Sequence, residues 1–189
     1  MNKKQLYESI MRSVSYEVKK ALNEGFELEN RFAPENVKDL CDIINERTSN
    51  EGYDCDLNDI DVSSIQSFAE FSAYLNRPDL FNCNISEWDV SNAENMSYMF
   101  DMCENFNRDI SKWNVANVVD MTGMFSDCRN FNSNISEWNV HNVQHMNFMF
   151  YNCRSFNQDL HYWHAPYVEY NDSIFRNCPI SEKFKPKFK

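Results

Sequence analysis

A 25-residue period runs through the second half of the sequence and leaves few folds open to the chain. All four tryptophans take part in it, because Trp88, Trp113, Trp138 and Trp163 follow one another at that interval. Two columns of phenylalanine and one of cysteine keep the same interval: Phe81, Phe106, Phe131 and Phe156; Phe100, Phe125, Phe150 and Phe175; Cys103, Cys128, Cys153 and Cys178. So many shared positions predict tandem units that bury a continuous core by stacking on one another.

Four regular units occupy residues 81–180, and a degenerate unit precedes them at 56–80. Within it, residues 57–65 (LNDIDVSSI) follow the pattern of residues 85–93 (ISEWDVSNA), and Ile60 stands where Trp88 stands. Terminal repeats are commonly atypical because they cover the end of a stack. We therefore expect five units over residues 56–180.

Each unit has two halves with different periodicity. Met96, Met99, Phe100 and Cys103 are spaced i, i+3, i+4 and i+7, which predicts one face of a short helix. The half around Ile85, by contrast, alternates and is rich in β-forming residues, which predicts extended chain. The sequence therefore predicts an α/β repeat solenoid, in which free thiols and asparagine side chains form internal columns.

Residues 1–50 carry no trace of the repeat, and the N-terminal segment, residues 1–55, is predicted to contain two helices. The first runs from about residue 3 to residue 23, with apolar residues at steps of four: Leu6, Ile10, Val14 and Val18. The second has Pro34 in its first turn and ends near Thr48. We expect this segment to form an α-helical N-terminal cap on the solenoid, or to dock onto a partner or a second copy of the chain. The two roles are compatible.

The unit pattern FNxDISxWxVxNVxxMxxMFxxCxx resembles the BspA-like leucine-rich repeat, also described as a lipoprotein 25-residue repeat of the DUF285 type. The resemblance is close over residues 81–180 and loose over 56–80. It implies a leucine-rich-repeat solenoid that binds proteins, often on bacterial surfaces and often with an adhesive role. Such proteins are usually secreted or lipid-anchored. The N-terminus here shows neither the apolar core of a signal peptide nor a lipobox cysteine, so we expect a cytoplasmic location.

Charge narrows the classes of partner. The chain carries 18 Lys and Arg against 29 Asp and Glu, a net charge of -11, and such a surface repels the phosphates of nucleic acids. No apolar run approaches the roughly 18 residues that cross a membrane. The last nine residues, 181–189 (SEKFKPKFK), are a basic tail. It is expected to be solvated, to lie along the acidic body, or to contact an acidic partner.

The sequence offers little for catalysis. It has no G-x-S-x-G elbow, no phosphate-binding glycine loop and no H-E-x-x-H motif, so we expect no enzyme and no cofactor. His141 and His145 have the i, i+4 spacing of metal ligands on a helix, but they fall in the predicted extended or corner part of a unit. No cysteine pair has C-x-x-C spacing, and we expect no metal site.

Protein binding remains, and the positions that vary between units are the candidates for its surface. They form three columns, and nine residues are the predicted contacts: Glu87, Lys112, Glu137 and Tyr162; Tyr98 and Phe148; Asp101, Tyr151 and Arg176. The leading hypothesis is a non-enzymatic protein–protein binding module. The alternative is an intracellular acidic inhibitor or decoy, possibly encoded by a mobile element, that blocks a basic nucleic-acid-binding protein.

Overall fold

A computed structural model describes residues 33–188, and this part of the chain opens with one α-helix, α3 (Val37–Glu51). Asn36 caps its first turn, because the side-chain oxygen accepts hydrogen bonds from the N–H groups of Lys38 and Asp39. Gly52, at φ 89°, ends it. The second predicted helix is thus confirmed, although it begins beyond Pro34. The first predicted helix, residues 3–23, lies outside the described residues.

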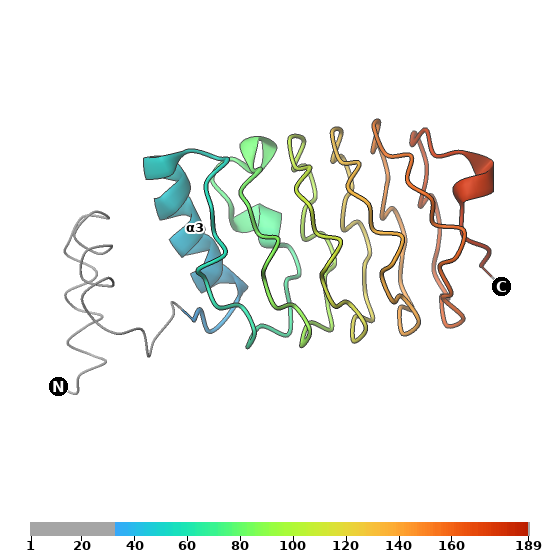
Figure 1. The fold of residues 1–189 in the computed structure, drawn as a ribbon, viewed down its shortest axis with the longest axis horizontal. Helices are drawn as coiled ribbons and strands as arrows, with labels where there is room; N and C mark the ends of the chain where they lie inside the picture. Colours follow the sequence, from blue (N-terminus) through green and yellow to red (C-terminus); the bar gives the residue numbers. More distant parts are fainter. Residues whose placement is uncertain (1–32, 189) are drawn as a thin grey trace. The chain divides into compact units, whose positions relative to one another are not determined.

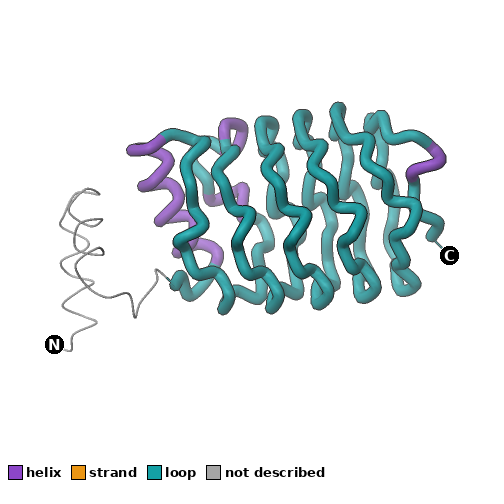
Figure 2. Tube along the Cα trace, in the orientation of Figure 1, coloured by secondary structure: helices purple, strands orange, loops and turns teal. Residues whose placement is uncertain are grey.

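After α3 the chain winds into a stack of similar coils (Figure 1), which consist almost wholly of turns (Figure 2). Residues 33–188 contain no β-strand, and besides α3 only three short 3-10 segments: η1 (Phe71–Tyr74), η2 (Pro78–Leu80) and η3 (Glu182–Phe184). Neighbouring coils meet at isolated parallel bridges, such as Asn95–Asp120 and Asp120–His145. The prediction of an α/β repeat solenoid was therefore wrong, because the units hold neither a repeated helix nor a repeated strand.

Closely spaced corners keep the half around Ile85 from forming a strand. The N–H of Trp88 bonds to the carbonyl of Ile85 at 3.2 Å, and the N–H of Ala93 bonds to the carbonyl of Val90 at 2.9 Å. Asn and Asp side chains tighten the same corners, as when Asp89 accepts from the N–H of Ser91. Successive turns leave extended runs that are too short for a ladder.

A different device keeps the half around Met96 from forming a helix. Tyr98 and Met102 adopt left-handed backbone, with φ 54° and 60°. As a result, alternate N–H groups point along the stack and bond to the next coil instead of to residue i−4. The four donors are Met96, Tyr98, Phe100 and Met102, and their acceptors are the carbonyls of Asp120, Thr122, Met124 and Ser126, at 2.8–2.9 Å. The four residues spaced i, i+3, i+4 and i+7, which are Met96, Met99, Phe100 and Cys103, still point inward and are fully buried, whereas Met102 is exposed.

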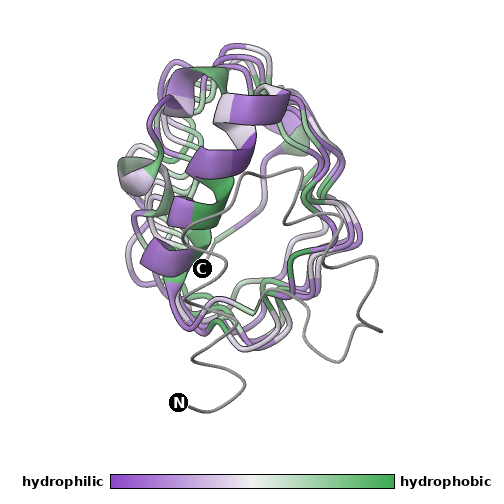
Figure 3. Cartoon of the chain, turned by 90° about the vertical axis from the view of Figure 1, so that its left-hand side faces the viewer, coloured by the Kyte–Doolittle hydropathy of each residue, from purple (hydrophilic) through white to green (hydrophobic). Residues whose placement is uncertain are grey.

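Rings stacked between coils form the core. Trp113 lies between Trp88 and Trp138, with ring centroids 6.4 and 6.5 Å away and planes within 7° and 3° of parallel. Its indole N–H also donates to the carbonyl of Ile85 at 3.1 Å. Viewed along the stack, the coils lie behind one another (Figure 3), so residues 25 apart meet throughout. Each tryptophan both fills the core and satisfies a buried carbonyl.

Asparagine and cysteine also form the expected columns. The side-chain oxygen of Asn107 accepts from the N–H of Asn132 at 2.8 Å, and that of Asn132 accepts from the N–H of Asn157 at 3.0 Å. The Cys128 thiol is free, fully buried and 2.8 Å from the carbonyl oxygen of Phe100. The prediction of free thiols is confirmed, and they are buried in all coils but the last, where Cys178 is half-buried.

The two ends of the stack differ. At one end α3 packs on the first coil, where the amide of Asn45 donates to the carbonyl of Tyr74 at 2.8 Å and the Cys41 thiol lies 3.4 Å from the carbonyl oxygen of Phe71. At the other end the basic tail follows the last coil, and the N–H of Leu160 donates to the carbonyl of Phe184 at 2.8 Å. Within residues 33–188, no helix has both the length and the apolar character to cross a bilayer.

Candidate binding surface

Two of the three predicted columns adjoin. In each coil one tight turn joins them, because the N–H of Asp101 bonds to the carbonyl of Tyr98 at 3.3 Å and the N–H of Tyr151 bonds to that of Phe148 at 3.0 Å. We call the combined surface the ridge. It consists of Tyr98, Asp101, Gly123, Ser126, Phe148, Tyr151, Ser173 and Arg176.

Left-handed backbone displays the ridge side chains. Tyr98, Gly123, Phe148 and Ser173 have φ values of 54°, 59°, 58° and 55°. Large side chains rarely adopt this conformation, which costs about 1–2 kcal/mol for a residue other than glycine. Here it turns the N–H of each residue toward the next coil. The side chains of Tyr98 and Phe148 stay 39% and 40% exposed, so two large aromatic groups face solvent on a fixed backbone.

Neighbouring side chains hold the ridge in place. The Tyr98 ring lies over Gly123, so closely that a Cβ added there would be 2.5 Å from its Cε1 atom. Phe148 meets Tyr151 edge-on at 6.0 Å, and the Arg176 guanidinium lies 6.0 Å from the centre of the Tyr151 ring.

Asp101 is the one ridge carboxylate with a perturbed pKa. Partial burial raises the pKa of Asp101, and a hydrogen bond with Ser126 opposes the increase. The carboxyl therefore interacts with the neighbouring coil rather than with solvent alone. It can orient the turn that carries Tyr98.

The third predicted column stands apart from the ridge. Lys112 pairs with Glu87 at 3.4 Å, and both side chains are exposed. Glu137 is exposed too, and Tyr162 is 82% exposed beside His161. Among the described residues, no hydrogen bond, ion pair or ring contact joins this column to the ridge. The nine predicted contacts therefore fall into two separate groups.

His141 and His145 contact aromatic neighbours rather than each other. His141 lies 5.3 Å from Tyr167 and 5.5 Å from His164 between ring centres, and His145 lies 5.1 Å from Tyr170. Across residues 33–188, no three His, Cys, Asp or Glu side chains gather as a metal site would require. The arrangement gives these histidines packing partners at the surface.

A pair of neighbouring thiols was not predicted from the sequence. Cys55 and Cys83 are buried with their sulfur atoms 3.0 Å apart. Their hydrogen bond lowers the pKa of Cys55 and raises that of Cys83. The signal was present, because the two cysteines have the same 28-residue offset that relates Leu57 to Ile85 in the degenerate unit.

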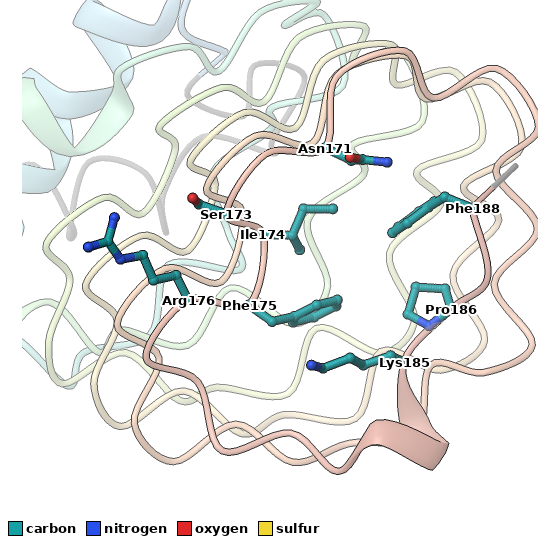
Figure 4. Close-up of a pocket in the computed structure, with 8 residues that line it drawn as sticks. All are labelled: Asn171, Ser173, Ile174, Phe175, Arg176, Lys185, Pro186 and Phe188. Atoms are coloured by element: carbon teal, nitrogen blue, oxygen red, sulfur yellow. The ribbon is translucent and has the colours of Figure 1, made fainter.

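A hollow at the C-terminal end was also missed. It measures about 440 Å³ and lies between the last coil and the basic tail. Figure 4 shows Ile174 and Phe175 on one side of it and Pro186 and Phe188 on the other, with Lys185 below. It arises because no coil within residues 33–188 covers residues 171–177, which the repeat pattern does not reveal.

Residues 70–187 match a protein-family model described as "Mycoplasma protein of unknown function, DUF285". That description contains neither the BspA-like name nor a leucine-rich repeat. No curated protein and no solved structure matches the chain.

Proposed function

The chain belongs to the DUF285 family, whose description gives no function, and we propose that it is a non-enzymatic binding protein whose ridge contacts a protein partner. One observation carries the proposal. Tyr98 and Phe148 stay 39% and 40% exposed on left-handed backbone that hydrogen bonds to the next coil hold in place.

The composition of the ridge fits a protein interface. Tyrosine and arginine are enriched among residues that dominate binding energy, and Tyr98, Tyr151 and Arg176 are of these types. Ring contacts hold Phe148, Tyr151 and Arg176 before a partner arrives, so binding would immobilise few additional side chains. The resemblance of the repeat to BspA-like proteins, many of them adhesive, supports the same class of function.

The test compares ridge variants with a matched control. A partner is captured with the intact chain from a lysate, identified, purified and titrated by calorimetry. The double variant Tyr98→Ala/Phe148→Ala should weaken its binding by about tenfold or more. Tyr167→Ala/Tyr170→Ala removes two exposed aromatic residues outside the predicted contacts and should leave affinity unchanged. Equal losses in both double variants would contradict a role for the ridge.

Salt separates this proposal from acidic inhibition of a basic protein. Raising salt from about 0.1 M to about 0.5 M shortens the Debye length from about 10 Å to under 5 Å. Binding through the aromatic residues of the ridge should persist across this range. A basic partner lost at the higher concentration would instead favour the inhibitor hypothesis, which the net charge of -11 motivates.

A further inference from the structure

The last coil presents a row of hydrogen-bond donors that nothing in the described chain occupies. In each internal coil, four alternate N–H groups bond to carbonyls of the next coil. The equivalent groups in the last coil belong to Asn171, Ser173, Phe175 and Asn177, and none of the four has a partner within residues 33–188. Ser173 and Asn177 keep the left-handed backbone of the row, with φ 55° and 59°. The donors are therefore aligned but unoccupied.

The rest of the stack shows what such a row accepts. The preceding row donates from Met146, Phe148, Phe150 and Asn152 to the carbonyls of residues 170, 172, 174 and 176, at 2.8–3.0 Å. Its acceptor is thus a chain segment that presents every second carbonyl on one side. Because the open row has the same backbone, a peptide segment with alternate carbonyls fits it in register.

The side chains at this end favour an acidic ligand. Three of the donor residues, Asn171, Ser173 and Phe175, line the hollow of about 440 Å³, and Lys185 and Phe188 line it too. The Lys185 ammonium lies 5.7 Å from the Phe175 ring centre and pairs with Glu182 at the tail. Residues 171–188 carry four basic side chains against two acidic ones, in a chain of net charge -11. A row of N–H groups that point the same way also attracts negative charge.

A second copy of the chain does not fit by continuing the stack. The carbonyls that would meet the row lie at the opposite end, on the first coil. There α3 covers that coil, with Cys41 and Asn45 in contact with the carbonyls of Phe71 and Tyr74. The open row therefore suits a different segment.

We propose that the C-terminal end of the stack is a second binding site, which takes an extended acidic peptide segment of a partner protein. Alternate carbonyls of the peptide accept from the N–H groups of Asn171, Ser173, Phe175 and Asn177, and an acidic side chain pairs with Lys185. Apolar side chains of the peptide cover Phe175 and Phe188. The site is distinct from the aromatic part of the ridge and does not depend on it.

The chain supplies a probe peptide for the test. Residues 119–127 (VDMTGMFSD) present four alternate carbonyls to the preceding coil and carry two aspartates. The acetylated and amidated peptide is titrated into the ¹⁵N-labelled full chain while amide resonances are recorded. The amides of Asn171, Ser173, Phe175 and Asn177 should shift downfield. Those of Arg176 and Cys178 already bond to Ser173 and Phe175, and should shift little.

Charge variants locate the acidic contact. Lys185→Glu should weaken the peptide about fivefold or more. Lys183→Glu makes the same charge change outside the hollow and should have little effect. A peptide with both aspartates replaced by asparagine should bind more weakly than the original. Sodium acetate alone should not reproduce the pattern.

Four results would overturn the proposal. The first is a peptide that shifts none of the four donor amide resonances. The second is a peptide that shifts the resonances of Arg176 and Cys178 as much as those of the four donors. The third is an equal loss of affinity in Lys183→Glu and Lys185→Glu, which would indicate general attraction to the tail. The fourth is the same alternating shifts with acetate, which would assign the row to small carboxylates.

Discussion

Gly123→Ala tests how tightly the ridge is built. Gly123 occupies the position of Tyr98 in the next coil, with φ 59°. Moving alanine into left-handed backbone costs about 1 kcal/mol or slightly more relative to glycine. The added Cβ would also lie 2.5 and 2.6 Å from two carbons of the Tyr98 ring, so the ring must move. Because Tyr98 is 39% exposed, it can turn away at a cost of about 1 kcal/mol in rotamer strain and lost contact.

The two contributions can be measured separately. Gly123→Ala alone should lower the free energy of unfolding by about 2 kcal/mol. In a Tyr98→Ala background, only the backbone contribution of about 1 kcal/mol should remain. The double-mutant cycle should therefore give a coupling energy of about 1 kcal/mol. Urea unfolding followed by tryptophan fluorescence measures all four proteins, and a midpoint change at constant m-value reports stability.

One outcome would refute the reasoning. If the two substitutions were additive to within about 0.3 kcal/mol, Tyr98 would not rest on Gly123 in solution. The aromatic residue would then move freely. The argument that the ridge is fixed before binding would fail with it.

Three further predictions concern the core. Burial raises the pKa of Cys128, so the buried neutral thiol contributes fully to the free energy of unfolding below the unfolded pKa of about 8.5. This contribution is lost as pH rises above that value, and the loss is about 1.4 kcal/mol at pH 9.5. Urea midpoints of the wild type should therefore fall more between pH 7 and pH 9.5 than those of Cys128→Ala. Trp113→Phe removes one of the two hydrogen bonds that the carbonyl of Ile85 accepts, since the bond from the Trp88 N–H remains, and should lower stability by about 0.5–1.5 kcal/mol in the same assay; an unchanged midpoint would contradict the indole bond. Diamide should oxidise Cys55 and Cys83 to a disulfide, because their sulfur atoms lie 3.0 Å apart, and non-reducing peptide mapping should find this link in the wild type but no link at Cys55 in Cys83→Ser.

The sequence predicted which residues face inward but not the backbone that places them. Tryptophan or phenylalanine residues that recur every 25 residues have one arrangement that buries every ring, so the stacking of the units followed from the spacing. Spacing of i, i+3 and i+4 arises equally from a helix and from linked tight turns. Tyr98 and Met102 give no sign of positive φ, because neither residue type favours it. The equivalent residues of the next coil, Gly123 and Asp127, do indicate positive φ, because both residue types tolerate left-handed backbone. A comparison of the units at these two positions would have predicted turns.

The candidate surface was predictable in part for the same reason. Variation between units identified exposed positions, and it placed Tyr98 and Phe148 correctly among them. It could not show that the column of Glu87 and Tyr162 stands apart, because that depends on where each coil turns. The open donor row was beyond prediction, since it exists only where a coil lacks a successor.

The direction of the hydrogen bonds between coils has a mechanical consequence. These bonds run along the stack, so tension along that direction is carried in full by every interface, and the interfaces separate one at a time with the weakest first. A coil of 25 residues that comes free would extend to about 85 Å, against a starting spacing of about 5 Å. The protein should therefore lengthen in steps of about 80 Å under load. The coil beneath α3, held by side-chain bonds from the helix as well, should be among the last to yield.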